Sequence, residues 1–359
     1  MKVIVVGAGI IGALTAFRLV QHGADVTIID AGQPATAASG ASFGWINANF
    51  FGNEDYFHLR HASMRAHRAL AHELGSQSVQ WQGCLCWEET GDAFDAQYNA
   101  LKDLGYGVRV VEKAEFQALE PAVAAPDRAL LFEEEGAVDL VHLTQDALQA
   151  GVSLGLQIIT GVAVTRIEVQ GDLVRGVRWS GGVIACDQVV LATGVATERL
   201  LADVGATLPM LTRPGLMVRS QRMAPVLAHI LASPEQELRQ DAQGRLLAPA
   251  AASHQADTSE TITQSPADLA DAAMARVSTL LGQPLRWEEV ALAHRPVPQD
   301  GMPAIGHCGP AGLYIATMHS GATLAPLAGE LAAMEVMEQP LTNTQAALIA
   351  PYRPQRFTG

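Results

Sequence analysis

Three glycines near the start of the chain have the spacing that a nucleotide-binding turn requires. Gly7, Gly9 and Gly12 form the pattern G-x-G-x-x-G, and Asp30 ends the next apolar run. The first glycine allows the tight turn, the second lets the backbone approach a pyrophosphate, and the third lets a helix pack closely on a strand. The start of that helix attracts phosphates, and an acid at this distance binds the adenosine ribose. The pattern predicts a dinucleotide site and leaves both NAD and FAD open.

The segments around these glycines are the ones that such a site needs. Val3–Val6 and Val26–Asp30 are short apolar runs, as expected of parallel strands buried on both faces. Between them, apolar and polar positions have helical spacing from Ile11 to near Gly23. We therefore predict a strand, a glycine turn, a helix and a second strand within one βαβ unit.

The rest of the chain changes character several times. Helices are predicted at 56–74, 140–154 and 324–338, and further strands at 81–89, 129–135 and 313–316. Gly161–Val190 is predicted to be a strand meander, because Gln170-Gly171-Asp172 and Ser180-Gly181-Gly182 are hairpin signals. Leu208–Pro298 is predicted to be rich in strands. Because β-rich stretches interrupt α/β stretches twice, we predict an α/β protein with two interwoven domains.

Composition and charge exclude several classes of protein. The 359 residues carry a formal net charge of −14, which argues against nucleic-acid binding, since such binding uses basic patches. The four cysteines have no metal-ligand spacing, which indicates ordinary thiols in a reducing compartment. No apolar run is long enough to span a bilayer, and the first strand leaves no room for a signal peptide. We expect a soluble, cytoplasmic protein.

Four histidines fall on the predicted helix 56–74. His58, His61, His67 and His72 have only partly the spacing that places ligands on one helix face, and no carboxylate is in register with them. We interpret them as a solvated helix face, and we expect no metal site.

Five further motifs occur in order along the chain. They are Ala38–Ser42, Glu135–Asp139 before a helix, the apolar run Val189–Gly194, Arg295-Pro296 with Asp300–Gly306, and His319–Gly321. Together with the glycine turn, they resemble the D-amino-acid oxidase, glycine oxidase and sarcosine oxidase superfamily over essentially the whole chain. The resemblance implies an FAD-binding Rossmann-like domain with a parallel sheet, interlocked with a smaller substrate domain built on a mixed β-sheet. We assign 1–77, 138–206 and 300–359 to the first domain, and 78–137 and 207–299 to the second.

The resemblance also implies where FAD binds. The pyrophosphate is expected at the turn of Gly7, Gly9, Ile10, Ile11 and Gly12, the ribose at Asp30 and Ala31, and the adenine at Val164. The path towards the flavin ring is assigned to Ala38, Ser39, Ser42, Phe43 and Gly44. Ala192, Thr193 and Gly194, at the end of the apolar run, are also expected to bind FAD. The flavin pyrimidine is expected at the loop of His319, Ser320, Gly321, Ala322 and Thr323, where a helix start favours the negative charge of reduced flavin. Relatives with covalent flavin carry a cysteine near the position of Arg295, where this chain has none, so we expect non-covalent FAD.

The residues expected to act on substrate are Arg295 and His319. Arg295 matches the arginine that holds the substrate carboxylate in glycine oxidase, and guanidinium offers a rigid fork for that group; taken alone, an ion-pairing arginine would be the simpler interpretation. The implied reaction places the substrate Cα–H over flavin N5, and the lone pair of the neutral amine drives hydride departure to give an imine, which hydrolyses to an oxo acid. This chemistry requires no side-chain base, so His254 and His294 receive no such role.

The substrate class stays broad: a D-amino acid, glycine, sarcosine or an opine fits the resemblance. Three alternatives remain open, namely a hydroxy-acid oxidoreductase of the same fold, an NAD-dependent dehydrogenase, and a flavin-holding subunit of an amine or opine dehydrogenase. The electron acceptor could be oxygen, a quinone or a partner protein, and homo-oligomers are possible. Some sarcosine oxidases place a lysine above the flavin to favour oxygen reduction, but Leu208–Pro298 contains no lysine. The sequence therefore favours a dehydrogenase over an oxidase.

Overall fold

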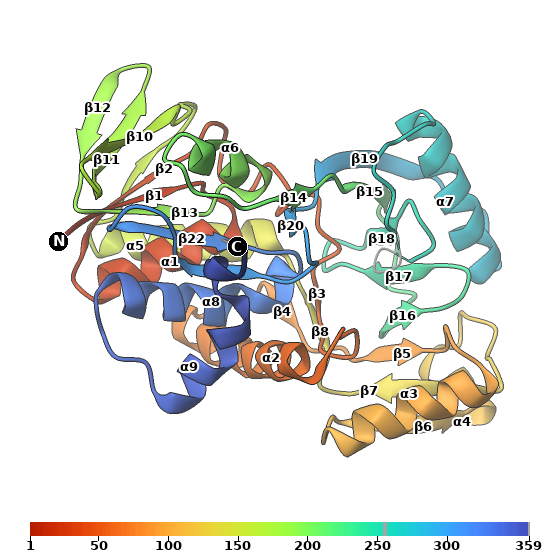
Figure 1. Cartoon of the computed structure of the whole chain (residues 1–359). Helices are drawn as coiled ribbons and strands as arrows, with labels where there is room; N and C mark the ends of the chain where they lie inside the picture. The colour runs from red at the N-terminus through yellow and green to blue at the C-terminus, as the bar shows by residue number, and fades with distance from the viewer. Residues whose placement is uncertain (254–256, 358–359) are drawn as a thin grey trace.

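The computed structural model describes residues 1–253 and 257–357, which form two lobes side by side (Figure 1). One lobe is built on a six-stranded sheet with the order β21-β22-β13-β1-β2-β9. The strands are β1 (Lys2–Val6), β2 (Asp25–Ile29), β9 (Gln157–Ile159), β13 (Gln188–Leu191), β21 (Ala304–His307) and β22 (Leu313–Thr317). All neighbours pair in parallel except β21, which pairs antiparallel with β22. The predicted α/β class with a parallel sheet is confirmed.

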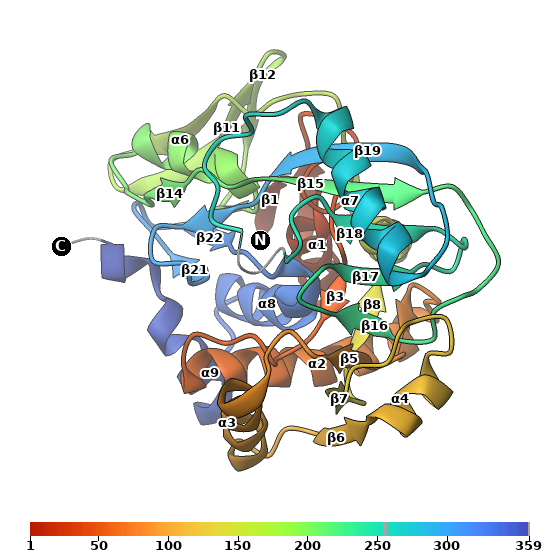
Figure 2. The same cartoon turned by 90° about the vertical axis from the view of Figure 1, so that its right-hand side faces the viewer.

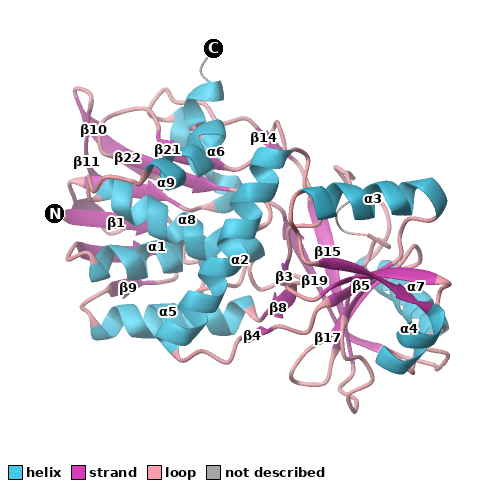
Figure 3. Ribbon diagram, turned by 90° about the horizontal axis from the view of Figure 1, so that it is seen from below, coloured by secondary structure: helices cyan, strands magenta, loops and turns pink. Residues whose placement is uncertain are grey.

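Each face of this sheet is covered, which explains why the central strands β1, β13 and β22 are almost entirely apolar and buried. Helices α1 (Ile10–Gln21), α5 (Leu140–Ser153) and α8 (Gly321–Val336) cover one face, and α2 (Glu54–Leu74) packs on α8 from outside (Figure 3). The antiparallel strands β10 (Arg166–Gln170), β11 (Leu173–Trp179) and β12 (Gly182–Ala185) cover the other face. Val5 packs towards the helices, whereas Ile4 packs towards β11.

The second lobe is an eight-stranded mixed sheet, seen in Figure 2, with the order β19-β15-β18-β17-β16-β5-β7-β6. Its strands are β5 (Cys84–Cys86), β6 (Val108–Glu112), β7 (Arg128–Phe132), β15 (Pro214–Ser220), β16 (Ile230–Ala232), β17 (Glu237–Gln240), β18 (Leu246–Pro249) and β19 (Trp287–His294). The two sequence segments meet where β5 pairs in parallel with β16. The sheet thus draws on 84–132 and 214–294, which fits the domain division that we propose.

One face of this second sheet packs on a helix that the sequence analysis did not predict. Helix α7 (Pro266–Leu280) buries Ala273 and Val277 against Val218 of β15, inside a stretch that we predicted to be rich in strands. Its start has the usual signals, because the Ser265 side chain accepts the Asp268 N–H and proline occupies the first turn. The prediction was wrong there because the flanking strand patterns outweighed these signals.

Short elements complete the lobes and connect them. Strand β8 (Gly136–Val138) pairs with β3 (Trp45–Ile46) and β4 (Val79–Gln80), and β14 (Met210–Leu211) pairs with β20 (Val297–Pro298). The remaining helices are α3 (Gly91–Asp103), α4 (Lys113–Leu119), α6 (Thr197–Ala202) and α9 (Asn343–Ile349), with 3₁₀ turns at Gly194–Ala196, Ala350–Tyr352 and Pro354–Phe357.

Two ion pairs, Arg353 with Glu335 and Arg356 with Asp300, fasten the C-terminal segment to the first lobe, and the first of them is the more buried. Arg353 donates from Nη1 and Nη2 to the two carboxylate oxygens of Glu335, at 2.7 and 2.6 Å, and the Tyr314 hydroxyl donates to the same group at 2.7 Å. The Glu335 side chain is only 16 % exposed. Such two-pronged, charge-assisted bonds are stronger than neutral ones.

We expect Glu335→Gln to lower the free energy of unfolding by about 1–3 kcal/mol, because the amide keeps its shape but loses the charge that Arg353 pairs with. Denaturant unfolding of the FAD-loaded protein measures this. The matched control is Glu338→Gln, at an exposed position of the same region, which should change stability by less than about 0.5 kcal/mol. Equal effects of the two variants would show that the ion pair adds no stability.

Candidate active site

The glycine turn has the geometry that the sequence predicted. Gly7 has a φ of +99°, and a side chain there would overlap the carbonyl of Ala192, while a side chain at Gly12 would overlap the carbonyl of Gly7. The turn therefore runs directly against the end of β13, and α1 starts immediately after it. Gly9, the N-cap residue of α1, has no side chain of its own, and Ser39 Oγ accepts the Ile10 N–H at 3.1 Å. A helix start of this kind, with its exposed N–H groups and positive dipole end, suits an anionic group such as a pyrophosphate.

Asp30 already fastens this turn through its carboxylate. Oδ2 accepts the N–H of Ala8 at 2.6 Å, and Oδ1 accepts the N–H of Gly32 at 2.7 Å. Each carboxylate oxygen has a further lone pair, so Asp30 can still accept a ribose hydroxyl. The residues present therefore fit the adenosine end of FAD.

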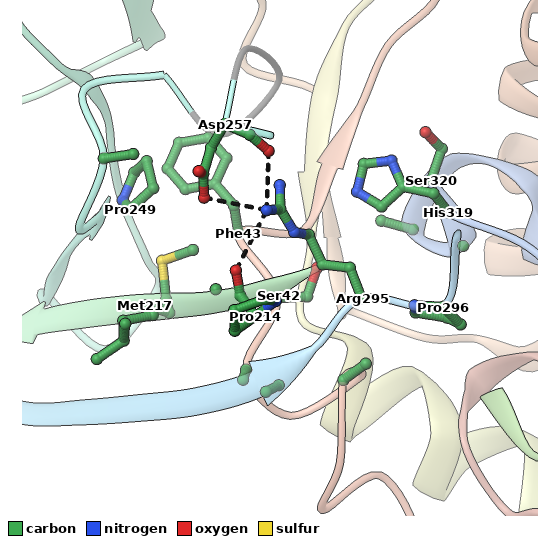
Figure 4. Close-up of a pocket in the computed structure, with 18 of the residues that line it drawn as sticks. Ser42, Phe43, Pro214, Met217, Pro249, Asp257, Arg295, Pro296, His319 and Ser320 are labelled. Carbon is green, nitrogen blue, oxygen red and sulfur yellow. Dashed lines mark hydrogen bonds and ion pairs between the residues drawn. The ribbon is translucent and has the colours of Figure 1, made fainter. Parts of the chain in front are cut away.

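A cavity of about 420 Å³ lies between the two lobes, next to this turn (Figure 4). Its wall includes these predicted residues: Ile10, Ile11, Ala38, Ser39, Ser42, Phe43, Gly44, Arg295, His319, Ser320, Gly321, Ala322 and Thr323. Met217 and Pro249, from the inner face of the second sheet, roof the cavity and were not predicted. The path predicted for the flavin end of FAD thus borders one continuous space.

The other predicted cofactor residues lie outside the described wall of this cavity. Val164 is buried beside the first sheet, in the same cluster as Val6 and Ile29. Ala31 follows Asp30 on an exposed turn, and Ala192, Thr193 and Gly194 lie against Gly7 or Pro296. These residues lie away from the cavity, and their roles in binding FAD stay predictions.

The predicted flavin loop ends in a strained residue at the start of α8. Ser320 has a φ of +60°, which costs a non-glycine residue about 1 kcal/mol or more. Thr323 donates its hydroxyl to the Trp45 carbonyl at 3.2 Å, and the Asn47 N–H donates to Thr323 at the same distance. The loop is therefore tied to the strand that follows Gly44.

A buried arginine completes this connection. Arg60 on α2 is 2 % exposed; its Nη1 donates to Ser320 Oγ at 2.7 Å, its Nε donates to the Asn47 carbonyl at 3.1 Å, and its Nη2 donates to the Asn47 side chain. None of the described carboxylates lies within ion-pair distance of Arg60. Since Arg60 also borders the cavity, it brings a buried positive charge to the predicted pyrimidine end.

A buried acid that interacts with the Arg60 charge is largely neutral itself at pH 7. Glu135 is fully buried and accepts from Trp45 Nε1 and from the Tyr106 hydroxyl, each at 2.8 Å. Burial raises the pKa of Glu135 to about 8, although these donors act in the opposite direction. A carboxyl group with this pKa is mostly neutral at pH 7.

One histidine of α2 corrects our interpretation of the helix. His67 is fully buried, not solvated, and its Nε2–H donates to the Ala322 carbonyl at 2.7 Å. Burial lowers the pKa of His67 to about 4, so the ring is neutral at pH 7. Its hydrogen bond to Ala322 ties α2 to the predicted flavin loop. His58 and His72 are exposed, and the described residues contain no cluster of metal-ligating groups.

Arg295 follows β19 and enters the cavity from the second lobe, as Figure 4 shows. Its Nη2 lies 3.0 Å from Asp257 Oδ2, 2.9 Å from the Asp257 carbonyl and 3.2 Å from the Pro214 carbonyl. Burial lowers the pKa of Arg295, and the Asp257 charge raises it. Arg295 thus both forms an ion pair within the protein and lines the cavity.

His319, which we expect to act on substrate, and the two histidines to which we assign no role as bases differ in position. His319 borders the cavity beside Arg295, whereas His294 is exposed on the other side of its strand. His254 lies outside the described residues.

Sequence reasoning missed Arg60 and Asp257, both of which border the cavity. Arg60 occupies a buried position within an otherwise polar helix, at i, i+4 spacing from Tyr56 and Met64, and that periodicity could have identified it. Asp257 lies in a loop without periodicity, and nothing in its sequence context indicates its contact with Arg295.

Comparisons with known proteins agree with this architecture. Residues 2–334 match the DAO family, described as FAD dependent oxidoreductase. Glycine oxidase of Geobacillus kaustophilus is 27 % identical over 99 % of this chain and 97 % of that protein. Its crystal structure matches with a TM-score of 0.87, at 25 % identity and 99 % coverage of both chains.

Two other relatives match over part of their length. The 4-methylaminobutanoate oxidase (formaldehyde-forming) of Paenarthrobacter nicotinovorans is 30 % identical over 61 % of this chain, which spans 27 % of that protein. A D-amino acid dehydrogenase of Rhizobium rhizogenes is 26 % identical over 58 % of this chain and 65 % of its own length. No described helix is both long and apolar enough to cross a membrane.

The family match over nearly the whole chain, the glycine turn and the cavity beside it lead to one conclusion. The protein is an FAD-binding oxidoreductase that belongs to the DAO family.

Proposed function

We propose that the protein oxidises the Cα–N bond of a small amino acid or secondary amine acid to an imine, which hydrolyses to an oxo acid. The observation that supports this most directly is the position of Arg295, whose guanidinium enters the cavity formed by Ser42–Gly44 and the loop 319–323 (Figure 4). When bound, FAD would supply the hydride acceptor. The names of the relatives, glycine oxidase and D-amino acid dehydrogenase, support an amino-acid substrate.

The residues around the cavity divide the work. Arg295 binds the substrate carboxylate, and His319 on the opposite loop contacts the substrate beside it. Met217 and Pro249 form an apolar roof that excludes water and limits the size of the substrate side chain. Fixing the carboxylate and the side chain orients the Cα–H, so positioning is the main contribution of the protein.

The first test is a panel of D-amino acids, glycine, sarcosine, proline derivatives and opines, with anaerobic bleaching of the flavin as the readout. On the best substrate, Arg295→Ala should lower kcat/KM by an amount that corresponds to about 2–5 kcal/mol of lost transition-state stabilisation, because a charge-assisted contact in a partly buried pocket is removed. FAD content should not change. Arg178→Ala, on the exposed face of β11, is the control and should behave as the wild type. If the kinetics of Arg295→Ala match that control, Arg295 does not bind the carboxylate.

A second expectation is that FAD is held without a covalent bond. Cys308 is buried in the core beside the first sheet, and none of the four cysteines borders the cavity. Acid precipitation should therefore leave yellow FAD in the supernatant. Colour that stays in the pellet would contradict this.

We also propose a dehydrogenase in preference to an oxidase. All three lysines, Lys2, Lys102 and Lys113, lie outside the cavity wall, so the lysine that favours oxygen reduction in some relatives is missing. After anaerobic reduction by substrate, a quinone or dye should reoxidise the flavin much faster than air-saturated buffer does. Reoxidation by oxygen at the turnover rate would establish an oxidase and show that the Arg60 charge suffices.

A further inference from the structure

Arg295, the proposed carboxylate-binding residue of the cavity, already forms an ion pair with a carboxylate of the protein itself. Asp257 Oδ2 lies 3.0 Å from Arg295 Nη2, and both side chains are only 17 % exposed. The other oxygen of Asp257 accepts the Ser259 N–H at 3.1 Å, so the carboxylate is held from its own loop as well. Figure 4 shows Asp257 on the side of Arg295 that faces away from His319, and both residues line the cavity.

This arrangement has a consequence for charge. Without substrate, Arg295 and Asp257 neutralise each other, and the nearby Arg213 is paired with Glu260 at 3.2 Å. A substrate carboxylate that binds Arg295 brings one more negative charge into a shielded site. Coulombic energies are larger in a buried site, where the dielectric constant is low, than in water. The extra negative charge is therefore costly unless a positive group enters the site with it.

The α-amino acid zwitterion carries such a group in the required place. One carbon separates its ammonium from its carboxylate, and Asp257 lies directly beside the guanidinium that binds the carboxylate. The two ion partners can then exchange, so that the substrate carboxylate takes Arg295 and the substrate ammonium takes Asp257. A hydroxy acid of the same shape offers only the first contact and leaves Asp257 without a cation.

We propose that Asp257 is a specificity-determining residue, which selects zwitterionic amino acids and rejects hydroxy acids by this exchange of ion partners. The inference rests on the proposed role of Arg295 and adds a second recognition group to it. It also separates the amine oxidoreductase from the hydroxy-acid alternative on the basis of one side chain.

Two unreactive probes of equal shape test the proposal. 2-Aminoisobutyrate and 2-hydroxyisobutyrate both lack the Cα–H, so neither is oxidised, and each Kd is measured on the FAD-loaded protein by calorimetry or flavin absorbance. The wild type should bind the amino acid roughly tenfold or more tightly than the hydroxy acid, the ratio expected of one charge-assisted contact. In Asp257→Asn this ratio should fall by about tenfold, chiefly because the hydroxy acid now binds more tightly.

The matched control is Glu260→Gln, which changes carboxylate to amide in the same loop at a 68 % exposed position that pairs with Arg213. It should keep the wild-type ratio. Asp257→Ser serves as a second variant, and equal FAD content and melting temperature confirm that each protein is folded. A wild-type ratio in both Asp257 variants would overturn the proposal, and so would an equal fall in Glu260→Gln.

Failure of the proposed function gives a different result. Arg295→Gln should weaken both probes, because both carry a carboxylate. If Arg295→Gln leaves both Kd values unchanged, the carboxylate anchor is wrong. If it weakens both while the Asp257 variants keep the wild-type ratio, the anchor stands and only the role of Asp257 is refuted.

Discussion

The guanidinium of Arg60 joins the segments on which the active site depends. It bonds to Asn47, directly after β3, and to Ser320 at the start of α8, in segments far apart in the sequence. A buried guanidinium without a carboxylate partner is unfavourable unless its donors are satisfied. The two segments supply those acceptors, so the position of one restrains the other. Ser320 has a left-handed backbone conformation, and its hydrogen bond from Arg60 helps to hold it there.

Local sequence signals predicted the nucleotide end of the site well. Gly12 is required by its contact with the Gly7 carbonyl and Gly7 by its own φ of +99°, and such local constraints leave a direct mark on the sequence. The buried strand Val3–Val6 is also predictable, because a parallel strand covered on both faces must be apolar at every position. The flavin loop is predicted through resemblance alone, since His319–Thr323 has no periodic pattern of its own.

The substrate end depends on contacts between distant segments, and there prediction from sequence was weaker. Asp257 pairs with Arg295 although 38 positions separate them in the sequence, so no local pattern links the two residues. His67 was interpreted as a surface residue because its neighbours on α2 are polar, yet its burial follows from α8 packing on that face. In both cases the chemistry of the residue is set by a partner that the local sequence does not identify.

The parallel pairing of β5 with β16 has a consequence for how the chain folds. Leu85 lies opposite Leu231, so the sheet above the cavity is continuous only after segments separated by well over a hundred residues have met. Closing so long a loop costs entropy before any contact compensates it, and topologies of this kind fold slowly. The hairpin of β6 and β7 and the βαβ unit around Gly7 need only local contacts. The glycine turn can therefore form early during synthesis, whereas the cavity between the lobes is among the last parts to be completed.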